Sequence, residues 1–234
     1  MRYVWATATH KGMVRDKNED SVFPTSSGES TDDVLAIVAD GMGGHVAGEV
    51  ASRIAINAAA SSDLGPTDRV AAGNRAIREE VARDPGLEGM GTTMTLLKVE
   101  DDIATIAHIG DSRAYLLRDG ELQQVTEDHT VAAEYVAQGQ LSPEQAASHP
   151  QRHMLVRTLG LTRFVNVDEV KLDLAPGDRV LLCSDGLTEM VRNETIGKIL
   201  ADGAPDEVVW NLVETANDAG GVDNITVVVV EALE

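Results

Sequence analysis

Five aspartates in this chain stand at the ends of apolar segments that have the length of β-strands. They are Asp20 before SVF, Asp40 after VLAIVA, Asp111 after IATIAHIG, Asp185 after VLLCS and Asp223 before NITVVVV. When such segments are buried, their ends bring the carboxylates together, and bare like charges a few Å apart are strongly unfavourable. A bound divalent cation removes that penalty, so the chain is predicted to fold around a cation site.

An Asp beside a Gly is also a common turn signal. Asp119-Gly120 fits that simpler reading, since it separates the segments Arg113–Leu117 and Glu121–Val125 as the turn of a hairpin. Any single aspartate of the five could be a turn residue, but five in the same context favour a shared site.

The chemistry of the expected ligands indicates which ion the site prefers. Oxygen donors suit Mg²⁺ or Mn²⁺, whereas Zn²⁺ sites are usually built with Cys or His, and Cys183 is the single cysteine of the chain. A carboxylate shared by two ions suits in-line displacement at phosphorus. Arg15 precedes Glu19-Asp20 and could bind two phosphate oxygens through its planar guanidinium, although a simple surface arginine is the alternative.

The order of the expected elements predicts an α+β fold. Short strands follow one another through tight turns, and helices are inserted in blocks, which favours antiparallel sheets with helices outside. The expected strands are Val4–Thr9, Asp20–Phe23, Val34–Ala39, Thr92–Val99, Ile103–Ile109, Arg113–Leu117, Glu121–Val125, Val165–Leu174, Arg179–Cys183 and Ile225–Val230. The expected helices are Ala47–Ala58, Thr67–Arg83, Asn193–Leu200 and Asp206–Ala219, and Pro24–Asp33 is expected to be a loop.

The segment Asp128–Gln151 is predicted to be a small helical insertion. Helical spacing runs from Asp128 to Gly139, and Ser142-Pro143-Glu144-Gln145 has the pattern of a capping box. Its apolar content is low, so we expect it to move and to affect substrate choice more than chemistry.

Composition excludes several classes of partner and location. The net charge of −20 repels nucleic-acid phosphates and anionic lipid, so neither nucleic-acid binding nor membrane contact is expected from this segment. No apolar run is long enough to cross a bilayer, Met1–His10 lacks the features of a signal peptide, and one cysteine excludes an internal disulfide. We therefore expect a soluble, cytoplasmic single domain over 1–234, with a membrane anchor beyond Glu234 left open.

Six motifs in order resemble those of the protein phosphatase 2C family of metal-dependent serine/threonine phosphatases, in its bacterial and especially its actinobacterial form. They cover nearly the whole chain. The motifs are Arg15-x-x-Asn18-Glu19-Asp20, Ala39-Asp40-Gly41-Met42-Gly43-Gly44-His45, Gly89-Met90-Gly91-Thr92-Thr93, Gly110-Asp111-Ser112-Arg113-Ala114, Cys183-Ser184-Asp185-Gly186-Leu187 and Asp223-Asn224-Ile225-Thr226.

The resemblance implies a four-layer α-β-β-α sandwich and a set of residue roles. Asp40 would bridge two ions, Asp185 and Asp223 would complete the shell of the first with Asp20 nearby, and Glu19 and the Gly41 carbonyl would serve the second. Asp111, together with Asp185, would hold a third and weaker ion. Asp128–Gln151 would be the flap beside the cleft. Phosphorylated proteins would be the substrates, among them bacterial Ser/Thr kinases and their targets, and the enzyme is expected to be a monomer.

The mechanism that the resemblance implies is attack on phosphorus by a metal-activated water, in line with the Ser or Thr oxygen. The catalytic set would be Asp40, Asp185 and Asp223, with Arg15 on the phosphoryl oxygens. Animal members carry a histidine, proposed as the general acid, where this chain has Met42. His45 is one candidate for that role, and a metal-bound water is the simpler one. Two other polar residues are expected to stay out of the chemistry: His108 is read as a satisfied core histidine and Cys183 as a buried thiol rather than a nucleophile.

Two other functions remain alternatives at this point. A non-catalytic binding module would be expected to have lost a metal-binding carboxylate or the arginine, and all of them are present. An acidic cation-binding protein without hydrolysis would leave Arg15 and Gly91-Thr92-Thr93 without a purpose.

Overall fold

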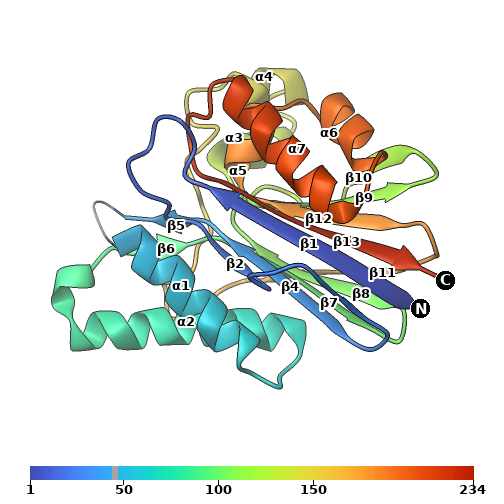
Figure 1. Cartoon of the computed structure of the whole chain (residues 1–234). Coiled ribbons are helices and arrows are strands. Elements are labelled where there is room, and N and C mark those ends of the chain that lie inside the picture. Colours follow the sequence, from blue (N-terminus) through green and yellow to red (C-terminus); the bar gives the residue numbers. More distant parts are fainter. Residues whose placement is uncertain (44–46) are drawn as a thin grey trace.

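Two antiparallel β-sheets stack face to face in the computed structural model, which describes residues 1–43 and 47–234 (Figure 1). The six-stranded sheet has the order β10 (Glu121–Gln124), β9 (Arg113–Arg118), β12 (Arg179–Cys183), β13 (Ile225–Leu233), β1 (Arg2–His10) and β3 (Gly28–Ser30). The five-stranded sheet has the order β11 (Asp168–Asp173), β8 (Ile103–Ile109), β7 (Met94–Glu100), β4 (Val34–Ala39) and β2 (Ser21–Phe23).

A pair of helices covers the outer face of each sheet (Figure 1). α1 (Ala47–Ala60) and α2 (Pro66–Arg83) lie on the five-stranded sheet, and α6 (Asn193–Leu200) and α7 (Pro205–Asp218) lie on the six-stranded sheet. Apolar side chains fill the three spaces between these four layers. The predicted α-β-β-α sandwich is therefore confirmed.

The central strand β13 explains why ITVVVV is apolar without alternation. Val227 and Val229 pack toward α6 and α7, whereas Val228 and Val230 pack toward the other sheet. A strand that is buried on both faces needs apolar residues at every position. Burial on both sides also fixes the position of the loop that carries Asp223, just before the strand.

The helix pair α1–α2 packs closely because its facing residues are small. A Cβ atom at Gly73 would lie 3.2 Å from the carbonyl oxygen of Ala55, so the two backbones approach as far as glycine allows. α2 begins at Pro66, one residue before the predicted start, and ends at Arg83 before Asp84-Pro85, as predicted.

Four expectations about secondary structure are wrong in detail. The predicted strand Thr92–Val99 is split at Thr93 into β6 (Gly91–Thr92) and β7. The segment predicted to be a loop contains β3, which pairs with β1 and lies under the indole of Trp5. The predicted strand Val165–Leu174 is shorter, as β11. The helix predicted from Asp128 starts only at Val131, as α3 (Val131–Ala137), because Thr130 caps it.

Short elements complete the chain, and several of them border the ends of the main strands. They are β5 (Gly41–Met42), β6 (Gly91–Thr92), the 3₁₀ turn Pro85–Leu87, α4 (Pro143–Ala147) with its capping box at Ser142, and α5 (Asp185–Thr188). Among the helices of the described residues, none combines the length and apolar character that crossing a bilayer would require.

Candidate metal centre

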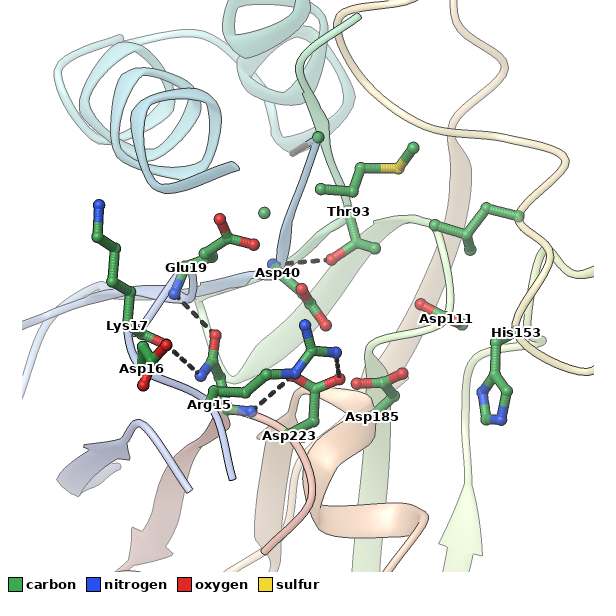
Figure 2. Close-up of a pocket in the computed structure, with 15 residues that line it drawn as sticks. Arg15, Asp16, Lys17, Glu19, Asp40, Thr93, Asp111, His153, Asp185 and Asp223 are labelled. Carbon is green, nitrogen blue, oxygen red and sulfur yellow. Dashed lines mark hydrogen bonds and ion pairs between the residues drawn. The ribbon is translucent and has the colours of Figure 1, made fainter. Parts of the chain in front are cut away.

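The ends of both sheets meet around one cavity of 660 Å³ that is lined by acidic side chains. Asp40 follows β4 and Asp111 lies just beyond β8, and both of these strands belong to the five-stranded sheet. Asp185 follows β12 and Asp223 lies just before β13, both in the six-stranded sheet. Figure 2 shows the four carboxylates directed toward a common space. Residues up to 183 positions apart in sequence thus converge as the strand ends predict.

Asp20 does not line this cavity and is buried, but it is close enough to Asp185 and Asp223 for their charges to raise its pKa. Ser184 donates its hydroxyl to Asp20 Oδ2 at 2.8 Å, which links the start of β2 to the residue before Asp185. The other oxygen, Oδ1, has no hydrogen-bond partner among the described residues, and the same is true of Asp185 Oδ1. Two buried carboxylate oxygens are therefore left with unused lone pairs.

Burial and mutual repulsion raise the pKa values of these acids. Burial is the main cause for Asp20, whose pKa rises to about 7 despite the hydroxyls of Thr226 and Ser184. Burial also raises the pKa values of Asp40 and Asp111 well above their ordinary range, with the neighbouring carboxylates adding to the effect. Such a site favours a bound positive charge.

The donor set fits Mg²⁺ or Mn²⁺. The acidic side chains that line the cavity offer oxygen, which is the ligand that these hard cations prefer. In Figure 2 the amino group of Lys17 points away from Asp40 and Asp185, so a lysine does not take the place of the cation. The unused oxygens of Asp20 and Asp185 match the need of a divalent ion for several ligands.

The backbone of Asp40 is fixed by two threonines to which the sequence analysis assigned no role. Thr93 donates its N–H to the Asp40 carbonyl at 2.9 Å, and its hydroxyl accepts from the Asp40 N–H at 3.0 Å. The Thr92 hydroxyl donates to the same carbonyl at 2.7 Å. The motif Gly89–Thr93 therefore positions the central carboxylate.

Asn224 holds the loop that carries Arg15 and Glu19. Its side-chain oxygen accepts from the Glu19 N–H at 2.7 Å, and its amide donates to the carbonyls of Lys11 and Lys17 at 2.9 and 2.8 Å. No local pattern singles out this residue within the Asp223–Thr226 motif, since its partners lie at the other end of the chain.

Two glycines are required by close approach. A Cβ atom at Gly41 would collide with the backbone of Gly48 in α1 and with the Glu19 carbonyl. A Cβ atom at Gly186 would collide with the Asn224 carbonyl. Glycine next to Asp40 and Asp185 therefore lets the segments around the cavity pack against one another.

Arg15 lies at the mouth of the cavity, with its side chain 52% exposed. Its Nη2 atom lies 2.5 Å from Asp223 Oδ2. Glu19 lines the cavity beside it, and burial raises the pKa of Glu19 while the Arg15 charge opposes that rise. The structure therefore places a guanidinium at the entrance, where it could reach an incoming phosphate.

The histidines divide into separate environments. His45 lies outside the described residues. His108 is buried and its ring nitrogens lie 2.9 Å from Thr95 Oγ1 and 3.1 Å from the Glu127 carbonyl, which confirms the prediction of a satisfied core histidine. His153, which the sequence analysis did not select, lines the cavity and its Nδ1 lies 2.5 Å from Glu189 Oε1.

The thiol of Cys183 is buried, and burial raises its pKa to about 12. A thiol with so high a pKa supplies almost no thiolate near neutral pH, which agrees with its predicted structural role.

Comparison with known proteins adds a family to this geometry. The family model described as protein phosphatase 2C matches residues 9–217. The serine/threonine protein phosphatase PstP of Mycobacterium tuberculosis is 43% identical over 239 residues, which cover 98% of this chain and 45% of PstP. The chain therefore spans about half the length of that curated relative.

Two solved structures of PstP are also similar. A crystal structure of the Mycobacterium tuberculosis enzyme superposes with a TM-score of 0.91 at 42% identity and covers 100% of both chains. A structure of the PstP catalytic domain in complex with two manganese ions superposes with a TM-score of 0.87 at 39% identity, again over 100% of both chains.

Proposed function

The chain belongs to the protein phosphatase 2C family, and from this premise we propose that it hydrolyses phosphoserine and phosphothreonine on proteins with bound Mn²⁺ or Mg²⁺. The observation that carries the proposal is the convergence of acidic residues from both sheets around one cavity, with unused oxygens on Asp20 and Asp185. A relative with two manganese ions supports the choice of cofactor.

The acidic residues have distinct roles in this proposal. Asp40 would be a ligand of two ions, Asp185 and Asp223 would help to hold the first of them, and Asp20 would support that site. The Glu19 carboxylate and the Gly41 carbonyl would hold the second ion. Asp111, on the side of the cavity nearer His153 in Figure 2, would hold a third and weaker ion together with Asp185.

The residues of the chain prepare the phosphate for in-line displacement. When bound, the ions supply an activated water and neutralise charge on the phosphoryl oxygens. Arg15 binds the same oxygens from the mouth of the cavity through its guanidinium. The protein groups are fixed before substrate arrives, because Thr92, Thr93 and Asn224 hold the backbone of Asp40 and Glu19. Such preorganisation is a major source of catalysis in phosphoryl transfer.

Hydrolysis of 4-nitrophenyl phosphate with Mn²⁺ tests the chemistry directly. We expect turnover that a chelator abolishes and that Asp185→Asn reduces by at least about 100-fold, since that variant replaces a charged ligand of the first ion with a neutral amide. Asp119→Asn in the exposed hairpin turn is the matched control and should keep wild-type turnover. Absence of turnover by wild-type protein saturated with Mn²⁺ would refute the proposal and favour a binding module.

A second cavity of 1100 Å³, which adjoins the first, supports the proposal of protein substrates. It lies under the proposed flap, 128–151, and shares Asp111, His153 and Asp185 with the catalytic cavity. A groove that leads away from the phosphate site can hold the chain on one side of a phosphoresidue. The proposed substrates are Ser/Thr kinases, phosphorylated on their activation loops, and the targets of those kinases.

A panel of phosphopeptides tests this preference. Activation-loop phosphopeptides should show a kcat/KM at least about tenfold above that of phosphopeptides of equal length and scrambled sequence, a difference of about 1.4 kcal/mol. Equal kcat/KM values for both sets would remove the kinase assignment and leave the hydrolysis unaffected.

We also propose that the protein acts as a monomer in the cytoplasm. The single cysteine is a buried free thiol, which is usual in a reducing compartment. Light scattering of the purified chain tests the monomer, and fractionation of the source cells tests the location.

A further inference from the structure

His129 is a buried residue at the base of the flap that touches the turn carrying Asp111. Its side chain is 4% exposed. The Gly110 N–H donates to His129 Nδ1 at 3.0 Å, and the His129 N–H donates to the Gly110 carbonyl at 2.7 Å. Both backbone polar groups of the residue before Asp111 are therefore bound to one histidine.

The turn Gly110–Ser112 is also held by contacts with Thr93 and Thr95. Gly110 has φ +114°, and a Cβ atom there would lie 2.5 Å from the Thr93 side chain. On the far side of Asp111, the Ser112 hydroxyl lies 2.7 Å from the Thr93 hydroxyl, and the Ser112 carbonyl accepts from Thr95 at 3.0 Å. His129 therefore supplies the side of the turn that the threonines do not hold.

The opposite edge of the imidazole is also bound. Because Nδ1 accepts from the Gly110 N–H, the proton is assigned to Nε2, which donates to Asp168 Oδ2 at 3.0 Å. Arg157 Nη1 also lies 3.1 Å from Nε2 but cannot donate to it in this tautomer. Arg157 donates to the other oxygen of Asp168 at 2.9 Å. A carboxylate behind a histidine fixes the ring orientation and its tautomer, as in the outer shell of many metal sites.

The same residue anchors the segment that leads out of the flap, residues 152–157, called the return segment. The Val156 N–H donates to the His129 carbonyl at 2.9 Å, and Thr130 forms a bridge with Leu155. This return segment also carries His153 into the catalytic cavity. One histidine thus contacts the turn before Asp111 and the segment that borders the cavity from the flap.

We propose that His129 is a positioning residue for Asp111: it holds the Gly110–Ser112 turn so that the carboxylate faces the cation site shared with Asp185. Asp168 holds the ring in place, and Arg157 holds Asp168. The inference rests on the proposed metal-dependent function but concerns a residue outside the ligand set. Loss of the Gly110 hydrogen bond should let the turn relax and weaken binding at the third and weakest site.

Calorimetric titration with Mn²⁺ alone tests the proposal without reference to activity. His129→Phe keeps the ring volume and removes both hydrogen bonds, and it should weaken the weakest Mn²⁺ site by about 10- to 100-fold, the usual effect of an outer-shell change. His129→Asn can still accept from the Gly110 N–H through Oδ1, so it should restore the affinity to within about threefold of wild type. In parallel, the Mn²⁺ concentration for half-maximal 4-nitrophenyl phosphate turnover should be higher for His129→Phe than for wild type. For His129→Asn it should be close to the wild-type value.

His149→Asn, at a histidine of the flap that does not contact the turn, is the matched control and should bind Mn²⁺ as wild type does. If circular dichroism shows that His129→Phe does not fold, Asp168→Ala replaces it, with Asp168→Asn as its conservative partner. Asp168→Ala should weaken the same site and Asp168→Asn should not.

Two outcomes would overturn the positioning role. One is wild-type Mn²⁺ affinity at every site in His129→Phe, or in Asp168→Ala where that variant is used. The other is an equal loss of Mn²⁺ affinity in His129→Phe and His129→Asn, or in Asp168→Ala and Asp168→Asn. That result would indicate a purely structural residue. Failure of the proposed function is distinguishable, because wild-type protein would then bind Mn²⁺ without hydrolysing phosphate esters.

Discussion

The carboxylate of Asp40 is held in a place where its charge is unfavourable. Burial raises its pKa, and Asp20, Asp185 and Asp111 raise it further. The backbone bonds from Thr92 and Thr93 keep it there. A protein that keeps such a group loses stability at that position and gains a binding site.

Asp40→Asn should therefore stabilise the metal-free protein. In chelator we expect the free energy of unfolding to rise by about 1–2 kcal/mol, because the variant removes one of several buried like charges. The increase in melting temperature that Mn²⁺ gives to wild type should disappear. Urea and thermal unfolding with and without Mn²⁺ measure both effects, and a less stable metal-free variant would contradict this account.

His108 should make stability depend on pH. Burial is the main cause that lowers its pKa to about 4, and His129, whose ring centroid lies 4.8 Å away, adds to the effect. Because the unfolded chain binds a proton near the ordinary pKa of about 6.5 and the folded chain does not, stability is full above that pH and is lost as pH falls toward 4.

Protonation of this histidine in the unfolded chain should lower the free energy of unfolding by at most about 3 kcal/mol between pH of about 6.5 and about 4. Urea unfolding of wild type and His108→Asn at a series of pH values measures it. The variant should be less stable than wild type near neutral pH, and the gap should narrow in acid. A gap that is constant with pH would mean that folding does not lower the pKa of His108.

The proposed flap is attached more firmly at its base than its helices suggest. Asp128 forms two hydrogen bonds with Arg113, at 2.8 and 2.6 Å, and His129 binds Gly110. The Val131 N–H also donates to the Met154 carbonyl at 2.9 Å, so the two ends of the helical part are adjacent. The first residues of the segment thus belong to the scaffold, and α3 and α4 form the part that can be removed.

Replacing residues 133–151 with a short Gly–Ser linker should separate substrate choice from chemistry. We expect kcat/KM for phosphopeptides to fall at least about tenfold, because the groove under α3 and α4 is lost, and turnover of 4-nitrophenyl phosphate to stay within about threefold. Deleting 128–151 should reduce both, since Asp128 and His129 go with it. Equal losses on the two substrates in the linker variant would contradict a role limited to substrate binding.

The charge of the whole molecule should act on protein substrates over a longer range. The net charge of −20 repels an acidic peptide and attracts a basic one, and salt screens both effects. At low ionic strength, phosphopeptides with basic flanks should have a higher kcat/KM than matched peptides with acidic flanks. Raising the salt concentration should bring the two values together, whereas a preference independent of salt would place its origin in local contacts.

The local sequence pattern was sufficient to predict the helices and strands that form the layers, and the aspartates of the site. Local patterns indicate the burial and backbone conformation of the residues that form them. Examples are the apolar run ITVVVV, the helical spacing in α1 and α2, and the capping box at Ser142. The aspartates could be recognised because each directly adjoins such a run. The motif resemblance then supplied the four-layer arrangement, which periodicity alone does not specify.

Only the folded chain decided which polar groups hold those acids in place. The bond from the Glu19 N–H to Asn224 joins residues 205 positions apart, and β3 forms a strand because β1 lies beside it. His129 and His153 have no periodic pattern of their own, and their roles come from the way the flap returns across the turn before Asp111. Such contacts depend on how the two sheets stack, and the stacking is fixed by packing summed over the whole core rather than by any local run of residues.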